Sequence, residues 1–127
     1  MAKKCLLFIE DYPVIQQMYV EVLKKEGFDV TISPDGENAL ELAVNHHYDI
    51  VIVDMLLPKM SGMEFLEKFK KLEAQKHEKP EVIVLTDFDD PNFVEKAQQL
   101  GVKHYWMKVE NTPHQLAEKI KAIATSK

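Results

Sequence analysis

Arginine is absent from this sequence: all 16 basic residues in the 127-residue chain are lysine. The chain therefore has no planar guanidinium group, which binds guanine or phosphate through two parallel hydrogen bonds. The formal net charge of -5 adds no attraction to a polyanion. We expect no direct binding to nucleic acid.

Cysteine and long apolar runs are also scarce. The single cysteine, Cys5, cannot form a disulfide within the chain and lies in an apolar segment, where we expect a buried side chain. No apolar stretch approaches the roughly 18 residues that span a bilayer, and no secretory signal is recognisable. We expect a cytoplasmic protein that does not insert into a membrane.

The length and the 46% apolar composition match one compact domain with a substantial core. Neither an internal repeat nor an interdomain linker divides the sequence. We expect one domain over residues 1–127.

Short apolar runs alternate with longer amphipathic segments along the chain. The runs predict strands at Cys5–Ile9, Val30–Ser33, Ile50–Asp54, Val82–Thr86 and Lys103–Met107. The segments between them predict helices starting near Pro13, Gly36, Ser61, Pro91 and Pro113. This alternation is typical of an α/β fold with a doubly wound, five-stranded parallel sheet. The expected strand order is 2-1-3-4-5, which also rests on the resemblance described below.

Two segments give more local expectations. The first helix should turn an apolar stripe inward, and this stripe consists of Ile15, Met18, Tyr19, Val22 and Leu23. The polar stretch Glu73–Pro80 is longer than a tight connection requires, so we expect a mobile surface loop there.

Polar residues occur where the predicted strands end, and they are Glu10, Asp11, Asp54, Thr86 and Lys108. A parallel sheet gathers these ends at one edge, the usual position of the functional crevice. On neighbouring strands about 4.8 Å apart, Asp11 and Asp54 would repel each other by about 3 kcal/mol at intermediate dielectric. A hard cation such as Mg²⁺ would relieve that repulsion.

Almost the whole chain resembles the receiver domains of two-component response regulators, through Glu10-Asp11, the segment Asp54–Gly62, Leu85-Thr86 and Lys108. The resemblance implies a flavodoxin-like receiver fold. It also implies that Asp54 accepts a phosphoryl group from a phosphohistidine of a histidine kinase or phosphotransfer protein. The cofactor it implies is Mg²⁺, held by Asp11, Asp54 and the main-chain carbonyl of Leu56, with Glu10 binding either directly or through a water molecule.

The same resemblance implies how phosphorylation is transmitted. Lys108 stabilises the phosphoryl charge, the hydroxyl of Thr86 turns toward a phosphoryl oxygen, and Tyr105 swings into the vacated space. The signal leaves to a protein target through the face formed by the helix after Pro91, the strand Lys103–Met107 and the helix after Pro113. We expect a monomer before phosphorylation and a possible homodimer after it.

Three departures from the family pattern matter. The lysine is followed by Val109 where receivers usually have a proline with a cis peptide bond, so we expect a trans bond and a rearranged or mobile loop. Asp87 adds negative charge beside the site and should slow phosphorylation unless it points to solvent. Leu56 and Phe88 are apolar at positions that influence hydrolysis, which predicts a long-lived phosphorylated state.

The leading interpretation is a stoichiometric phosphoacceptor that acts as a signalling switch, and not a turnover enzyme. One alternative is an atypical receiver that binds its partner without phosphorylation. A hydrolase with an aspartyl-phosphate intermediate is disfavoured because Leu56 stands where such enzymes carry a second acid. A flavodoxin is disfavoured because the carboxylates of Glu10 and Asp11 would repel the cofactor phosphate.

Overall fold

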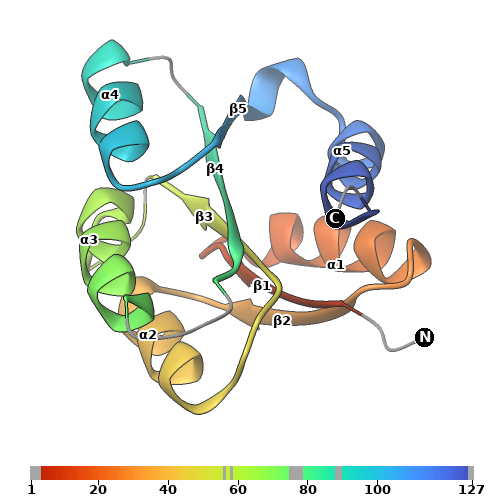
Figure 1. Ribbon diagram of the computed structural model, residues 1–127. Coiled ribbons are helices and arrows are strands. Elements are labelled where there is room, and N and C mark those ends of the chain that lie inside the picture. The colour runs from red at the N-terminus through yellow and green to blue at the C-terminus, as the bar shows by residue number, and fades with distance from the viewer. Residues whose placement is uncertain (1–3, 56, 58, 75–78, 88–89, 126–127) are drawn as a thin grey trace.

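The structure, a computed structural model, describes residues 4–55, 57, 59–74, 79–87 and 90–125 (Figure 1). One parallel sheet has the strand order β2-β1-β3-β4-β5. The strands are β1 (Cys5–Ile9), β2 (Asp29–Ser33), β3 (Ile50–Asp54), β4 (Glu81–Thr86) and β5 (His104–Met107). The predicted fold class and strand order are confirmed, and three strands begin one residue away from the predicted position.

Helices cover both faces of this sheet (Figure 1). They are α1 (Pro13–Lys25), α2 (Gly36–Asn45), α3 (Gly62–Glu73), α4 (Pro91–Gln99) and α5 (Pro113–Thr125). A short 3-10 helix, η1 (Lys108–Glu110), connects β5 to α5. None of the described helices has the length and apolar character that crossing a membrane demands.

The helix starts follow from local hydrogen bonding. The hydroxyl of Ser61 accepts a hydrogen bond from the Glu64 amide at 3.1 Å and caps α3. Before α5, the Gln115 amide donates to the Thr112 hydroxyl, and the Thr112 amide donates to the Gln115 side chain at 2.9 Å. This second arrangement is the reciprocal capping box that the sequence predicts.

Two apolar clusters fill the space on either side of the sheet. Leu7 and Val51 point toward α2 and α3, whereas Leu6 and Ile50 point toward α1 and α5. Because both faces are covered, the central strands are apolar without interruption. In β5, Tyr105 packs against the first cluster and Trp106 against the second, as strand alternation predicts.

Local expectations were less accurate than the fold. Met18 is 46% exposed, because it lies at the margin of the α1 stripe whose other members pack inward. Cys5 is only partly buried against the first cluster. Glu73 is the buried last residue of α3 and not part of a loop, and residues 75–78 of the predicted mobile loop lie outside the described residues.

Candidate functional site

The predicted polar residues meet at the carboxyl edge of the sheet because of strand register. Ile9 of β1 pairs with Val53 of β3, so the residues that follow them, Glu10 and Asp54, emerge side by side. Thr86 ends the next strand, β4, and pairs with Met107. Lys108 follows Met107 directly. Four of the five strands therefore carry a polar residue at this edge, either as the last residue of the strand or as the residue directly after it.

A buried ion pair forms the centre of this edge. The Lys108 ammonium lies 2.7 Å from Asp54 Oδ2 and 3.2 Å from Glu10 Oε2. Glu10 is fully buried, and Asp54 is 4% exposed. Buried charges are tolerated only when they are paired, and Lys108 provides the positive charge in this arrangement.

Three carboxylates gather beside this lysine. One oxygen each from Glu10, Asp11 and Asp54 can be chosen so that all three lie within 4.8 Å of one another. Asp11 is exposed at the mouth of the site, whereas the other two are buried. Carboxylate oxygens are hard ligands that suit Mg²⁺, and one lysine leaves this cluster with excess negative charge. The donor set fits the predicted cation, and no second cluster of this kind occurs in the part of the chain that the structure describes.

Glu10 and Lys108, the two buried neighbours of Asp54, differ in how the site affects their charge. Burial, with the hydrogen bond and charge of Asp54, raises the pKa of Glu10 to about 7, although Lys108 opposes the shift. Burial disfavours the charged form of Lys108, but Asp54 and Glu10 outweigh it and raise the Lys108 pKa. Lys108 therefore stays charged at neutral pH, while Glu10 titrates there.

The main chain around Glu10 is fixed by residues that the sequence did not single out. The side-chain amide of Gln16 donates to the Glu10 carbonyl, and the Glu10 amide donates to the Ser33 carbonyl at 2.9 Å. The Tyr12 amide approaches the Glu10 carboxylate at 3.4 Å. Gln16 lies one turn into α1, and nothing in the pattern distinguishes it from the exposed Gln17.

The loop after Asp54 packs closely against the start of α3. A Cβ atom at Gly62 would lie 2.7 Å from the Met55 Cα and 2.8 Å from the Asp54 carbonyl oxygen, so only glycine fits. Glycine at position 62 therefore allows this close turn before α3. The predicted main-chain metal ligand, Leu56, lies outside the described residues.

The predicted switch residues occupy the edge between β4 and β5. Thr86 is fully buried at the end of β4, and Tyr105 is half-buried on β5. Asp87 is exposed, which is the solvent-pointing arrangement considered from the sequence. Phe88, the other predicted modulator, lies outside the described residues. The roles of these four residues in phosphorylation stay predictions.

The connection after Lys108 has its own geometry. Residues Lys108–Glu110 form η1, and no cis peptide bond occurs among the described residues. The Asn111 amide donates to the Lys108 carbonyl at 3.2 Å, and the Asn111 side chain donates to the Met107 carbonyl at 2.9 Å. The expected trans bond is thus present, and Asn111 fixes the backbone around the lysine.

The fold and this edge define a class of protein. Residues 6–121 match the response regulator receiver domain family. The chain belongs to this family, as the resemblance indicated.

Individual relatives agree with this assignment. The chain is 32% identical over 93% of its length to the transcriptional regulatory protein PdtaR of Mycobacterium tuberculosis, of which it covers 54%. It is 27% identical over 85% of its length to sporulation initiation phosphotransferase F of Bacillus subtilis, of which it covers 84%. The chain spans about half or less of the length of the first curated relatives it matches.

Among solved structures, a CheY-like response regulator receiver domain protein from Methanospirillum hungatei superposes with a TM-score of 0.86. It is 28% identical, and the match covers 96% of this chain and 94% of that one. The family and the fold are therefore shown, whereas the chemistry at Asp54 is argued from the site itself.

Proposed function

We propose that this chain is a phosphorylation-controlled switch in which Asp54 accepts one phosphoryl group per molecule. The observation that carries the proposal is the buried Asp54 carboxylate, 2.7 Å from the Lys108 ammonium and clustered with Glu10 and Asp11. A nucleophile, a fixed cation and a candidate metal site thus share one edge of the sheet. We propose that residues 1–127 act in the cytoplasm as one receiver domain.

In the proposed reaction, a carboxylate oxygen of Asp54 attacks the phosphorus of a phosphohistidine on the donor protein. The phosphorus–nitrogen bond breaks, and the imidazole leaves with its electron pair. Glu10, Asp11, Asp54 and the Leu56 carbonyl would hold Mg²⁺, which when bound supplies positive charge for the phosphoryl oxygens. Lys108 neutralises the remaining charge and orients the Asp54 carboxylate.

Phosphorylation changes which charges face Lys108. Its ammonium pairs with Asp54 Oδ2 in this structure, but phosphorylation of Asp54 to the acyl phosphate moves the negative charge to the phosphoryl oxygens. We propose that Lys108 follows that charge and that the Thr86 hydroxyl donates to a phosphoryl oxygen. Tyr105 then moves inward, and the surface of α4, β5 and α5 changes for a downstream protein.

The phosphoryl donor must bring its histidine to the mouth of the site. Large apolar side chains are exposed beside Asp11 at the start of α1: Tyr12 is 65% exposed, Val14 67% and Met18 46%. Adjacent exposed apolar residues favour a protein contact. We propose that the donor docks here.

This docking surface can be tested separately from the chemistry. Met18→Glu should slow transfer from a cognate histidine kinase at least tenfold without slowing phosphorylation by acetyl phosphate. Val44→Glu is the matched control because Val44 is 62% exposed on α2. Equal slowing with both donors would place the effect of Met18→Glu on the site itself.

Intact mass spectrometry after incubation with acetyl phosphate tests the switch. We expect a gain of one phosphoryl group that requires Mg²⁺ and is lost in Asp54→Asn. If no phosphoryl group is gained and beryllofluoride also fails to bind, the alternative of a phosphorylation-independent binding module takes precedence. The exposed Asp87 and the absent proline after Lys108 are the features that favour this alternative.

A further inference from the structure

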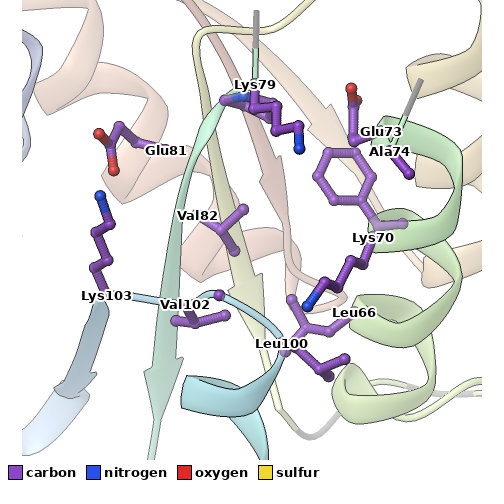
Figure 2. A pocket seen from close by; sticks show the side chains of 13 residues that line it. Leu66, Lys70, Glu73, Ala74, Lys79, Glu81, Val82, Leu100, Val102 and Lys103 are labelled. Carbon is purple, nitrogen blue, oxygen red and sulfur yellow. The ribbon is translucent and has the colours of Figure 1, made fainter. Parts of the chain in front are cut away.

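A second concave site lies at the opposite edge of the sheet, away from Asp54. It has a volume of about 500 Å³ and is bordered by the end of α3, the start of β4 and the connection from α4 to β5 (Figure 2). Val82 of β4 lines it, whereas Thr86 ends the same strand four residues later. At the usual rise per residue these two positions are about 13 Å apart. The two sites are therefore separate.

The floor of this amino-edge pocket is apolar. Leu66 and Phe69 contribute from α3, Val82 from β4, and Leu100 and Val102 from the connection between α4 and β5. Side chains from three separate chain segments converge there, and the volume falls within the range of small-molecule sites. A hydrocarbon chain would be removed from water in this position.

The rim carries more positive than negative charge. Three lysines and two glutamates line the pocket. Glu81 lies 3.5 Å from the His104 ring, and Figure 2 shows it facing Lys103 on the far side of β4. The negative charge of Glu81 is therefore directed away from the space between β4 and α3.

Two of these lysines, Lys70 and Lys79, border the space between β4 and α3. Figure 2 shows Lys70 extending from α3, and Lys79 from the segment before β4, into the space between α3 and β4. The Lys70 ammonium donates to the Gln99 carbonyl at 3.1 Å, a neutral acceptor that leaves its other protons available. The buried Glu73 contributes the opposing charge at the end of α3.

We infer that the amino-edge pocket binds a small amphipathic carboxylate. Its apolar chain would lie on Leu66, Val82 and Val102, and its carboxylate would be bound by Lys70 and Lys79. This inference does not rest on the proposed function at Asp54.

Octanoate is a suitable probe. Octanol and octylammonium carry other headgroups on a hydrocarbon chain of the same length and serve as controls. Nuclear magnetic resonance titration of the wild-type protein should show saturable shifts at the methyl groups of Val82, Leu100 and Val102. Octanoate should bind at least fivefold more tightly than octylammonium. Lys70→Gln and Lys79→Gln should each weaken octanoate binding about threefold and leave octanol unaffected. Lys121→Gln, on α5, is the matched control.

A blocking variant tests the location. Ala74 is exposed and lines the pocket, so Ala74→Trp should cover it and reduce octanoate binding at least tenfold. Ala122→Trp places the same side chain at an exposed position of α5 and should have no effect.

Equal affinity for the three headgroups would overturn the assignment and leave an apolar pocket suited to a side chain of a partner protein. The inference also fails if no shift saturates, or if the shifts gather at Tyr12, Val14 and Met18 instead.

Discussion

The two edges of the sheet are built in opposite ways. At the carboxyl edge, Glu10, Asp54 and Thr86 are buried polar groups, and the backbone packs so tightly that Gly62 admits no Cβ atom. At the amino edge, the lysines stay on the exposed rim of an apolar pocket, and a Cβ atom at Gly101 would meet nothing within 4 Å. One sheet thus supports a crowded, charged site at one end and an open pocket at the other.

Burying charged groups has a physical cost at the carboxyl edge. Burying Glu10 beside Asp54 opposes its ionisation, and the lysine that compensates is itself desolvated. The expected reason for retaining such an arrangement is function, since buried apolar residues would fold more stably there. At the amino edge, Glu81 avoids this cost because it is partly exposed and lies 3.5 Å from the His104 ring.

The largest difference in stability between the two edges should appear when a glycine at each edge is replaced by alanine. Gly62→Ala should lower the free energy of unfolding by about 3 kcal/mol, because its Cβ would overlap the Met55 and Asp54 backbone. Gly101→Ala should cost about 1 kcal/mol from its positive φ of 89° alone. Urea denaturation of both variants checks this, and equal losses would show that close packing at Gly62 is unimportant.

A smaller effect is expected from removing the charge of Glu10. Its folded-state pKa of about 7 exceeds the usual 4.5, so the folded protein binds this proton more tightly than the unfolded chain. The charge therefore costs stability above pH 7, and the cost disappears as the pH falls toward 4.5. Glu10→Gln should raise the free energy of unfolding by about 2 kcal/mol at pH 8 and by almost nothing at pH 4.5.

The matched variant at the amino edge is Glu81→Gln. Because Glu81 is partly exposed, we expect a change below about 0.5 kcal/mol at pH 8. Urea denaturation without added metal at both pH values makes the comparison. A Glu10→Gln variant that is less stable than the parent at pH 8 would mean that the Lys108 interaction outweighs the burial of the charge.

Metal binding should also distinguish the edges. Asp11→Asn should weaken Mg²⁺ binding at least tenfold, about 1.4 kcal/mol, because it removes a charged oxygen ligand. Asp29→Asn, an exposed acid at the start of β2, should leave the affinity unchanged. Fluorescence of Trp106, the only tryptophan, or calorimetry can follow the titration. The wild-type affinity should fall as the pH is lowered through about 7, because Glu10 takes up its proton there. Equal affinities for parent and Asp11→Asn would remove Asp11 from the ligand set.

The smallest effect is expected at Asp87. Its exposed carboxylate is screened by water, so Asp87→Ala should speed phosphorylation by acetyl phosphate only about threefold. Asp29→Ala controls for the change in net charge. A rate for Asp87→Ala no faster than that of the parent would remove Asp87 as a brake on the reaction.

Much of this arrangement is predictable from the sequence because parallel strands end at a common edge. The runs before Glu10, Asp54 and Thr86 are uninterrupted and apolar, so the strand ends are sharp and the residues that follow them must meet. The capping box Thr112–Gln115 is equally local, since both partners lie within one turn.

Contacts between distant elements were less predictable. The hydrogen bond from Gln16 to the Glu10 carbonyl depends on how α1 docks beside β1. The amino-edge pocket depends on the separation of α3 and α4, and its lysines look like ordinary surface residues in the sequence. The prediction that Met18 points inward was wrong. An apolar stripe specifies which face of a helix is buried, but it does not specify which residues at the border of that face are exposed.

Chemical trapping of the acyl phosphate would show directly which carboxylate accepts the phosphoryl group. After incubation with acetyl phosphate and Mg²⁺, borohydride reduces an aspartyl phosphate to homoserine, and peptide mass spectrometry locates the changed residue. We predict homoserine at position 54 alone, dependent on Mg²⁺ and absent in Lys108→Ala. Homoserine at position 11, or an unchanged peptide in a protein that has gained a phosphoryl group, would mean that Asp54 is not the phosphoacceptor.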